Sequence, residues 1–531
     1  MNTAAPAIAA GRRLWVGIPG LRLTAAVRAH LERVRPGGIV LFARNLDGAT
    51  QAQGLIAELR DLLGAATHIA IDQEGGRVVR FTRDLTVFPG NAALGAVAER
   101  DLPGAIALAR RQGELGGREL RAVGVDVNFA PVADLSARAD NPVVADRSFG
   151  RDPQCVAALV AAFVEGQRAA GVRTTLKHFP GLGGARVDPH VELPQIDGPF
   201  ESSALAPFRA GLAAGAELVM TTHVCFPAID VVPVTFSASV VRDRLRGRLG
   251  FRGVVVSDAL EMAGVARHFG LAEIIQRTAA AGHDVLCLGS DDATLQEQAH
   301  AVLTDGYRAA AEWVGDVPAT DARLDTLARR AMGSPLEAGG ADSRAAGAVE
   351  LADAQFEPGR ALAAEIAWRA LRVVDDPLGL LPLRPNAGDT DPSKSRRPVV
   401  ALPCLAARTL AEDRLRGERL EVLREGLGSA ATIADYDSEP GPADVVALAR
   451  LAIDTEVLVL VSFDVRFSPA RRALAQHALQ WNPRVVFVLL SDLHDLGALP
   501  AGHRATTVVA HGFRRVHQVA VLRALLGEPG S

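Results

Sequence analysis

The densest group of chemically useful side chains lies in one short segment, residues 177–190. It reads K-H-F-P-G-L-G-G-A-R-V-D-P-H and holds a lysine, two histidines and an acid. Asp188 and His190 are two positions apart, and in an extended loop the side chains of residues i and i+2 point to the same side. The carboxylate can then hold one ring nitrogen and leave the other for a substrate, which is typical of general acid/base chemistry. A loop histidine with a chance acidic neighbour is the alternative.

A second candidate is an acid that directly follows an apolar run. Residues 254–262 read V-V-V-S-D-A-L-E-M, and Asp258 is their fifth residue. A carboxylate at this place can act as a nucleophile or as a base. It can also be the N-cap of a helix, because aspartate is a preferred cap and Ala-Leu-Glu-Met is good helix sequence. The residues alone leave these roles open.

A third segment, residues 71–80, combines charges with a Gly-Gly turn and reads I-D-Q-E-G-G-R-V-V-R. The carboxylate of Asp72 can accept hydrogen bonds from sugar hydroxyls. Arg77 or Arg80 can donate hydrogen bonds to the same sugar. The alternative is a structural ion pair around the turn.

A fourth segment, residues 140–150, reads D-N-P-V-V-A-D-R-S-F-G and is rich in loop-forming residues. Its Arg147 can contact a ligand or brace the loop. No H-x-x-x-H pattern or carboxylate cluster points to a metal, and the four cysteines are scattered without a C-x-x-C pair. We therefore expect no metal site.

The elements that position these residues are predicted to be parallel strands. Across residues 1–335, short β-branched runs alternate with stretches of helical periodicity such as Ala49–Leu63 and Pro153–Ala170. Near-continuous apolar runs are typical of parallel strands that are buried on both faces. Eight such units predict a (β/α)8 barrel, with an open doubly wound sheet as the rival. The predicted strands are Leu14–Ile18, Gly38–Phe42, His68–Asp72, Val125–Ala130, Thr174–His178, Leu218–His223, Val254–Asp258 and Asp284–Leu288.

Several of the polar residues stand at the ends of these strands. Asp72 ends the third strand, Lys177 and His178 end the fifth, His223 ends the sixth and Asp258 ends the seventh. The active sites of barrels lie at the carboxyl ends of the strands. We therefore expect these side chains to meet at one site, since a simple return of polarity after each strand explains only one or two of them.

The composition changes beyond the barrel. Residues 336–397 are predicted to be a linker, with a Gly/Ala/Ser-rich part at 336–350, a helix over Pro358–Val374 and a polar part over Asn386–Arg397. Residues 398–531 predict a smaller α/β sandwich with a largely parallel sheet. No G-x-G-x-x-G follows its first strand, so nucleotide binding has no support. It can pack on the barrel, lend a loop to the site or mediate dimerisation. Its predicted strands are Val399–Leu402, Thr432–Ala434, Val457–Ser462, Val485–Leu490 and Thr506–Ala510.

Composition and charge exclude several classes of protein. Hydrophobic residues make up 49% of the chain, so a large core is available. The net charge is −4, which gives no basic field for nucleic acid or an anionic membrane. No apolar run reaches the length of a membrane span. The N-terminal basic pair follows the small apolar stretch, so no export signal is indicated, and we expect a cytoplasmic protein.

The motifs in residues 10–335 resemble glycoside hydrolase family 3, and within it the bacterial β-N-acetylhexosaminidase branch. That branch carries K-H-F-P-G-H-G-x4-D-[S/T]-H, and this chain has K-H-F-P-G-L-G, four residues, then D-P-H. The segments D-Q-E-G-G-R-V, R-S-F-G and S-D-A-L-x-M also match in the same order. A barrel followed by an α/β sandwich resembles the longer members of the branch.

The resemblance implies retaining hydrolysis of a β-linked N-acetylglucosaminide through a covalent glycosyl-enzyme, without a cofactor. Asp258 would be the nucleophile and His190 the general acid/base, supported by Asp188. The expected partner is an amino-sugar oligosaccharide or a muropeptide fragment from peptidoglycan, not a nucleic acid or a membrane. The residues expected to bind the non-reducing N-acetylglucosamine are Asp72, Arg80, Arg147, Lys177 and His178.

Two residues depart from the family pattern. Pro189 stands where the family has serine or threonine, which removes a hydroxyl and stiffens the loop. Leu182 stands where a histidine is usual. We expect these changes to affect loop motion and rate, and not the identity of the Asp188–His190 pair.

Two other functions stay open at this point. A neutral histidine would not repel phosphate as a carboxylate would, so a glycoside phosphorylase of the same fold is one. A catalytically weak amino-sugar-binding protein, with Pro189 as a sign of decay, is the other.

Overall fold

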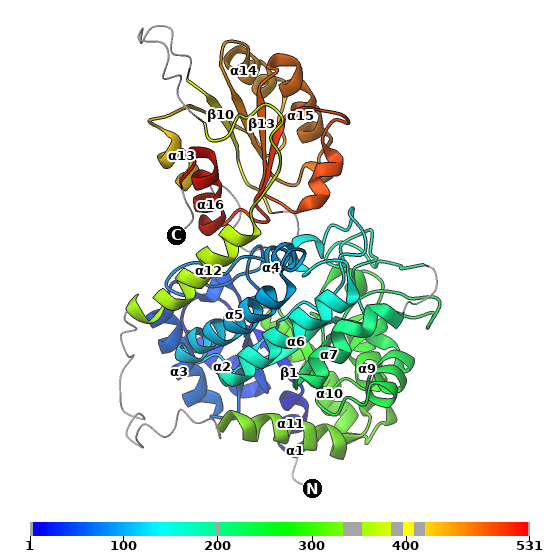
Figure 1. Ribbon diagram of the computed structural model, residues 1–531. Helices are drawn as coiled ribbons and strands as arrows, with labels where there is room; N and C mark the ends of the chain where they lie inside the picture. The colour runs from blue at the N-terminus through cyan, green and yellow to red at the C-terminus, as the bar shows by residue number, and fades with distance from the viewer. Residues whose placement is uncertain are drawn as a thin grey trace.

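The computed structural model describes residues 4–197, 202–332, 353–383, 397–407, 412 and 420–528. These residues form two units, each built around one sheet. Figure 1 shows the second unit standing on one end of the first, with helix α12 (Glu357–Ala370) along the junction. The predicted linker part at 336–350 and most of Asn386–Arg397 lie outside the described residues.

The first unit is an eight-stranded parallel barrel. Neighbouring strands pair in the order β7-β6-β5-β4-β3-β2-β1-β8. A parallel bridge between Val256 and Val285 joins the two ends of this order and closes the ring. The predicted barrel is therefore confirmed, and the open sheet is excluded. The strands are β1 (Leu14–Gly17), β2 (Gly38–Leu41), β3 (His68–Ile71), β4 (Val127–Asn128), β5 (Arg173–Phe179), β6 (Leu218–Thr221), β7 (Val254–Ser257) and β8 (Leu286–Leu288).

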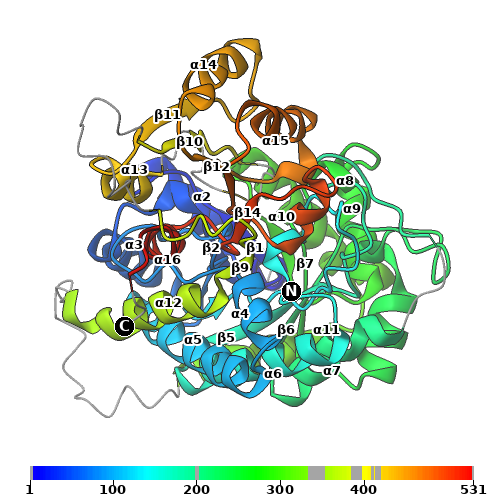
Figure 2. The same ribbon diagram turned by 45° about the horizontal axis from the view of Figure 1, so that its top comes forward.

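Helices surround the barrel strands, as the turned view in Figure 2 shows. The predicted helical stretches Ala49–Leu63 and Pro153–Ala170 are confirmed to within one residue. The helices of this unit are α1 (Ala4–Arg12), α2 (Ala25–Val34), α3 (Ala49–Leu63), α4 (Asn91–Ala98), α5 (Leu102–Ala122), α6 (Pro153–Ala169), α7 (Ala206–Ala213), α8 (Ala263–Ala266), α9 (Leu271–Ala281), α10 (Ala293–Arg308) and α11 (Val317–Met332), with a π-helix η5 (Ser239–Arg248).

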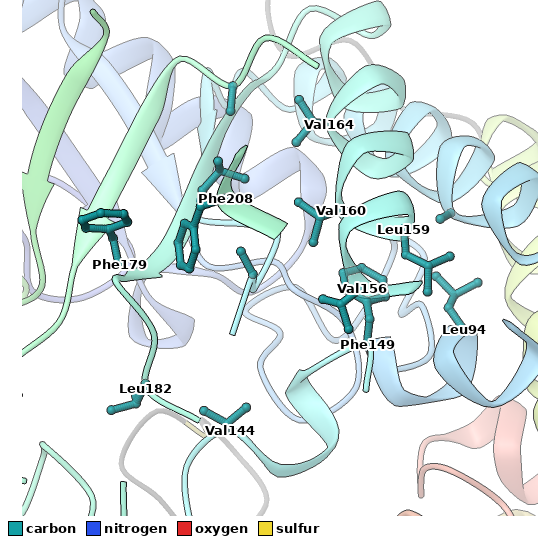
Figure 3. Close-up of a cluster of buried hydrophobic side chains, with 14 of the residues drawn as sticks. Leu94, Val144, Phe149, Val156, Leu159, Val160, Val164, Phe179, Leu182 and Phe208 are labelled. Carbon is teal, nitrogen blue, oxygen red and sulfur yellow. The ribbon is translucent and has the colours of Figure 1, made fainter. Parts of the chain in front are cut away.

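Apolar packing on both faces of the strands holds the barrel together. Successive side chains of a strand point to opposite faces. In β1, Trp15 accordingly packs with one cluster and its neighbours Leu14 and Val16 with another. A third cluster lies between strands and helices, where the rings of Phe179 and Phe208 meet edge to face at 5.2 Å beside apolar side chains of α6 (Figure 3).

The second unit is a six-stranded sheet with helices on both faces. Its strand order is β11-β10-β12-β13-β14-β9, and β9 alone pairs antiparallel, with β14. Alternate residues of β12 separate into two apolar clusters: Val459 packs on one face and Leu460 on the other. The predicted α/β sandwich is confirmed. Its strands are β9 (Arg372–Asp375), β10 (Val399–Pro403), β11 (Thr432–Tyr436), β12 (Leu458–Ser462), β13 (Val485–Leu489) and β14 (Thr506–Val509), and its helices are α13 (Glu421–Leu427), α14 (Pro442–Ile453), α15 (Pro469–Trp481) and α16 (Arg515–Leu526).

One predicted element ends differently in the structure. The helix expected over Pro358–Val374 is α12, and it ends at Ala370. The β-branched pair Val373 and Val374 belongs to β9, which pairs with β14 at the edge of the second sheet. Pairing with a strand more than 130 residues later decides the conformation here, so local helical pattern could not reveal it.

Candidate active site

A pocket lies at the carboxyl ends of the barrel strands, and we call it the strand-end pocket. Seven of the eight predicted site residues line it. The eighth, Asp188, lies behind His190. The polar or charged lining residues are Asp72, Glu74, Arg80, Arg147, Lys177, His178, His190 and Asp258, and the apolar ones are Val40, Phe42, Val78, Phe129, Val143, Leu182, Pro189, Met220, Ala259, Met262 and Cys287.

Asp188 and His190 form the expected pair. The ring Nδ1 of His190 lies 2.7 Å from Oδ1 of Asp188, and the backbone N–H of His190 donates to the same oxygen at 2.9 Å. The pair forms within a turn instead of an extended loop, because the Asp188 carbonyl also accepts from the backbone of Val191 and Glu192. Since a carboxylate only accepts, Nδ1 donates and Nε2 is left for the pocket.

Burial by itself would raise the pKa of Asp188, but its hydrogen bonds to His190 outweigh burial and lower it. Asp188 therefore stays a carboxylate across the neutral range. The fixed negative charge beside Nδ1 keeps a proton on that nitrogen and so fixes the orientation of the ring.

The loop that carries this pair is packed against its surroundings at both departures from the family pattern. The carbonyl of Pro189 accepts from the backbone N–H of Gly264 in α8 at 2.9 Å. Leu182 is buried and belongs to the same apolar cluster as Val144, and Figure 3 shows both side chains. The Leu182 carbonyl also accepts from Asn141. An apolar side chain at 182 thus fits the packing of this loop on the loop that carries Arg147.

Asp258 follows β7 at the mouth of the barrel. Its backbone N–H donates to the carbonyl of Thr221 in β6 at 3.2 Å, and its Oδ1 accepts from the backbone of Ala259 at 2.9 Å. The next helix, α8, begins only at Ala263 with Met262 at the N-cap position. The N-cap alternative for Asp258 is therefore wrong, since its side chain does not reach a first helical turn.

His223, expected to join the site from the end of β6, stands behind Asp258 instead. It is fully buried, and its Nε2 donates to the carbonyl of Ala259 at 2.9 Å. The hydroxyl of Thr235 lies 2.6 Å from its Nδ1. Burial lowers the pKa of His223, so the ring is neutral. Its hydrogen bond to the Ala259 carbonyl fixes the turn that presents the Asp258 carboxylate.

The floor of the pocket is a network of alternating charges. Lys177 Nζ contacts Asp72 Oδ1 at 2.7 Å and Glu74 Oε1 at 2.5 Å. Arg147 makes a bidentate pair with Glu74 at 2.8 and 2.9 Å, and Arg80 reaches Asp72 at 3.1 Å. Such a network presents fixed donors and acceptors to a polyhydroxylated ligand.

Mutual pairing keeps this network charged despite its burial. Burial raises the pKa of Glu74, but Arg147 and Lys177 outweigh it and lower that pKa to about 2. Lys177 and Arg80 likewise outweigh burial at Asp72 and hold its pKa well below the usual range. Burial by itself would lower the pKa of Arg147, but the carboxylate of Glu74 outweighs burial and raises it. These side chains therefore act as hydrogen-bonding groups of fixed charge.

Two residues of the site were not singled out from the sequence. Glu74 was visible only as a second acid two positions after Asp72. Asp134 holds His178, since its Oδ2 lies 2.7 Å from Nδ1 of that ring and 3.1 Å from its backbone nitrogen. It also accepts from the backbone of Leu182 at 2.7 Å. The position of Asp134 gave no comparable signal, because β4 ends at Asn128 and Asp134 lies further along the chain, whereas Asp72 directly follows β3.

Arg77, one of the two arginines considered for sugar contact, does not line the pocket. It is buried against the second unit, as described below. Within the described residues there is no group of three or more histidines, cysteines and acids that could hold a metal ion. No helix in that part of the chain is long and apolar enough to cross a membrane.

Glu261, three residues after Asp258, has a carboxyl group whose raised pKa can be tested. Burial raises the pKa of Glu261 to about 7, and its Oε1 accepts from the Ser290 backbone at 2.5 Å. A carboxyl group whose pKa is raised on folding costs stability as pH rises from its unfolded value through its folded value. We expect Glu261→Gln to match the wild type near pH 5 and to be more stable near pH 8.

The expected gain at pH 8 is at most about 3 kcal/mol, from about 1.4 kcal/mol per pKa unit. Denaturant unfolding of both proteins at the two pH values measures it. The amide oxygen of glutamine can still accept from Ser290, so equal stability differences at pH 5 and pH 8 would contradict the raised pKa.

Comparisons with known proteins identify the family to which the barrel belongs. Residues 12–328 match the Glycosyl hydrolase family 3 N terminal domain. The chain is 42% identical over 277 residues to a β-hexosaminidase of Xylella fastidiosa strain M23, which covers 51% of this chain and 82% of that protein.

Two solved structures are similar as well. A family 3 β-N-acetylglucosaminidase from Paenibacillus sp. FPU-7 superposes with a TM-score of 0.84 at 29% identity, covering 98% of this chain and 97% of its own. NagZ from Neisseria gonorrhoeae in complex with N-trifluoroacetyl-D-glucosamine superposes with a TM-score of 0.52 at 31% identity, covering 60% of this chain and 97% of its own. The first likeness spans both units, whereas the second covers about three fifths of this chain.

Proposed function

Because this chain belongs to glycosyl hydrolase family 3 and is a β-hexosaminidase, we propose that it is a retaining enzyme that removes terminal β-linked N-acetylglucosamine. The observation that supports the proposal best is the Asp188–His190 pair at the pocket that Asp258 also lines. A nucleophile and an oriented acid/base around one pocket are the two groups that retaining hydrolysis requires.

In the first step the Asp258 carboxylate attacks the anomeric carbon. The bond from that carbon to the departing oxygen breaks, and His190 Nε2 gives its proton to the oxygen. A covalent glycosyl-enzyme results. In the second step His190 takes a proton from water, the water oxygen attacks the anomeric carbon, and the Asp258 carboxylate leaves.

Histidine suits this double role near neutral pH, since its reference pKa is about 6.5. Asp188 adds orientation through two hydrogen bonds, one to the ring and one to the backbone. Most retaining glycosidases use two carboxylic groups, but here the second acid acts through the histidine. No second carboxylate therefore faces Asp258 in the acid/base role.

The charge network supplies recognition of the sugar. Lys177, Arg147 and Arg80 donate hydrogen bonds to sugar hydroxyls, and Asp72 accepts them. These side chains already hold one another, so little conformational freedom is lost when the sugar binds. His178, fixed by Asp134, completes this wall of the pocket.

For the natural substrate we propose fragments derived from peptidoglycan, such as muropeptides, from which a single terminal N-acetylglucosamine is removed. The lining of the strand-end pocket includes two aromatic residues, Phe42 and Phe129. A row of aromatic platforms, as a long polysaccharide would need, is not among the described lining residues. The site therefore fits one terminal sugar better than an internal one.

The proposal is tested by specificity. We expect p-nitrophenyl β-N-acetylglucosaminide to be cleaved roughly ten- to a hundred-fold better in kcat/KM than the matched β-glucoside. The two substrates differ by one acetamido group, and a site that hydrogen-bonds this group leaves its own polar atoms unpaired when the group is missing. Steady-state kinetics with both substrates measures the ratio.

The same assay, run in phosphate and in a non-nucleophilic buffer, separates hydrolysis from phosphorolysis. Hydrolysis gives free sugar with retained configuration in both buffers, whereas phosphorolysis gives a sugar 1-phosphate in phosphate. Comparable kcat/KM on the two glycosides would contradict the assignment to N-acetylglucosamine. Binding without turnover would favour an amino-sugar-binding protein.

A further inference from the structure

The junction between the two units contains a fully buried arginine surrounded by acids. Arg77 is 1% exposed, and its guanidinium contacts three carboxylates. Asp146 of the barrel lies 2.5 Å from Nε, while Asp464 and Glu412 of the C-terminal part lie 2.6 and 3.5 Å from the two Nη atoms. The C-terminal part of the chain thus supplies two of the three partners of this barrel residue.

Other contacts of the C-terminal part converge on the same place. The guanidinium carbon of Arg77 lies 4.4 Å from the ring centre of Phe463. Arg514 donates from Nε to the carbonyl of Gly76 at 2.8 Å. The C-terminal part therefore holds this turn both through its backbone, at Gly76, and through the side chain of Arg77.

This turn belongs to the segment that holds the sugar-binding charges. Gly75 and Gly76 have φ values of +99° and +56°, and a Cβ at Gly75 would lie 2.7 Å from the carbonyl oxygen of Pro89. The chain can turn here only with glycine. Glu74, directly before the turn, binds both Arg147 and Lys177 in the pocket.

Asp146, the partner of Arg77 in the barrel, is also adjacent to this charge network. Asp146 immediately precedes Arg147, and both lie in the short 3-10 helix η2 (Ala145–Arg147). Arg77 therefore ties together the two segments whose side chains meet in the Glu74–Arg147 pair. Every described residue that lines the pocket belongs to the barrel, so the C-terminal part acts on it only indirectly.

We propose that Asp464, assisted by Glu412, is a positioning residue for the N-acetylglucosamine site. It holds Arg77, Arg77 holds Asp146 and the Gly-Gly turn, and these hold Glu74 and Arg147 in their sugar-binding geometry. The C-terminal domain thereby contributes to sugar affinity and rate without touching the sugar. This inference rests on the proposed function, which names the sugar that the network binds.

The burial of Asp464 and its hydrogen bonds suit it to this positioning role. Its side chain is 3% exposed, and its Oδ1 also accepts from the hydroxyl of Ser491 at 3.1 Å. Its backbone has a φ of +54°, which is uncommon for a residue other than glycine, and its N–H donates to Ser491 at 2.7 Å. The carboxylate is held firmly on the side facing the barrel.

The test compares Asp464→Asn with a matched control at the same junction. Glu99→Gln breaks the pair between Glu99 and Arg372, which is 2.8 Å long, joins the same two units and does not touch Arg77. We expect Asp464→Asn to lower kcat/KM on the β-N-acetylglucosaminide by about tenfold or more and to weaken binding of free N-acetylglucosamine. Asp464→Glu, which keeps the charge, should recover part of the loss, and Glu99→Gln should behave as wild type.

A double-mutant cycle with Asp146→Asn adds a readout that general destabilisation would not move. Because both acids act through Arg77, the double variant should lose less kcat/KM than the product of the two single losses. An Asp464→Asn variant that melts earlier but keeps kcat/KM and N-acetylglucosamine affinity within about twofold would overturn the proposal. If it does not fold, Glu412→Gln, which removes the longer contact, must show a smaller loss of the same kind, and no loss would overturn the proposal.

The wild type separates this inference from the proposed function. If the wild type binds N-acetylglucosamine in calorimetry but does not cleave its glycosides, only the proposed function is wrong. The affinity of Asp464→Asn for N-acetylglucosamine then still tests whether Asp464 positions the sugar site. A wild type that neither binds nor cleaves would overturn both.

Discussion

Replacing Asp258 by asparagine is expected to lower kcat on a β-N-acetylglucosaminide by roughly 10³- to 10⁵-fold while the protein stays folded. An amide cannot form the glycosyl-enzyme, so the main route is closed. The fold should survive because the amide oxygen of asparagine can still accept from the backbone of Ala259, as Oδ1 of Asp258 does. Steady-state kinetics and thermal unfolding of the purified variant measure the two effects separately.

A second aspartate serves as the matched control. Asp292 is an N-cap, since its side chain accepts from the backbone of Thr294 and Leu295 at the start of α10. Asp292→Ala should lose about 0.5–2 kcal/mol of stability and keep its activity. If Asp258→Ala behaved in the same way, with early melting and near-normal turnover, its role would be structural and the proposed nucleophile would be wrong.

Contacts between residues close in sequence were predictable in this protein. The Asp188–His190 pair follows from two residues at a spacing of two, and the structure places their atoms within 2.7 Å. The reason given for it was incomplete, because the pair forms in a turn that the sequence did not reveal. The strand ends were predictable in part. Asp72, Lys177, His178 and Asp258 end predicted strands and line one pocket, whereas His223 ends a strand and does not line it.

Contacts between distant residues were not predictable in the same way. Glu74 matters because it pairs with Lys177, about 100 residues later in the chain. Asp134 matters because it holds the ring of His178. For Arg77 the sequence offered two alternatives, a sugar contact and a structural ion pair. Which alternative is right depends on Asp464, 387 residues away, because that acid pairs with the guanidinium of Arg77 and holds it away from the pocket. No local pattern contains this information.

Replacing His190 by alanine is expected to separate substrates by their leaving groups. For a poor leaving group, such as a sugar, the first step needs a proton, and its rate should fall by roughly 10²- to 10⁴-fold. For 2,4-dinitrophenyl β-N-acetylglucosaminide the first step needs no proton and should slow much less. The second step still lacks its base, so a burst of dinitrophenol followed by a slow steady state should mark the accumulating glycosyl-enzyme.

The ring of His190, and not the loop alone, must cause this behaviour if it is the acid/base. Asp188→Asn is the informative companion, because it keeps the ring but takes away the negative charge beside Nδ1. It should lose less rate than His190→Ala on substrates with poor leaving groups, since the ring that moves the proton is still present. Azide, a nucleophile that needs no base, should restore the second step of His190→Ala and give a glycosyl azide of retained configuration. Equal losses on good and poor leaving groups, with no burst and no rescue by azide, would rule out His190 as the group that moves the proton and leave it a structural member of the loop.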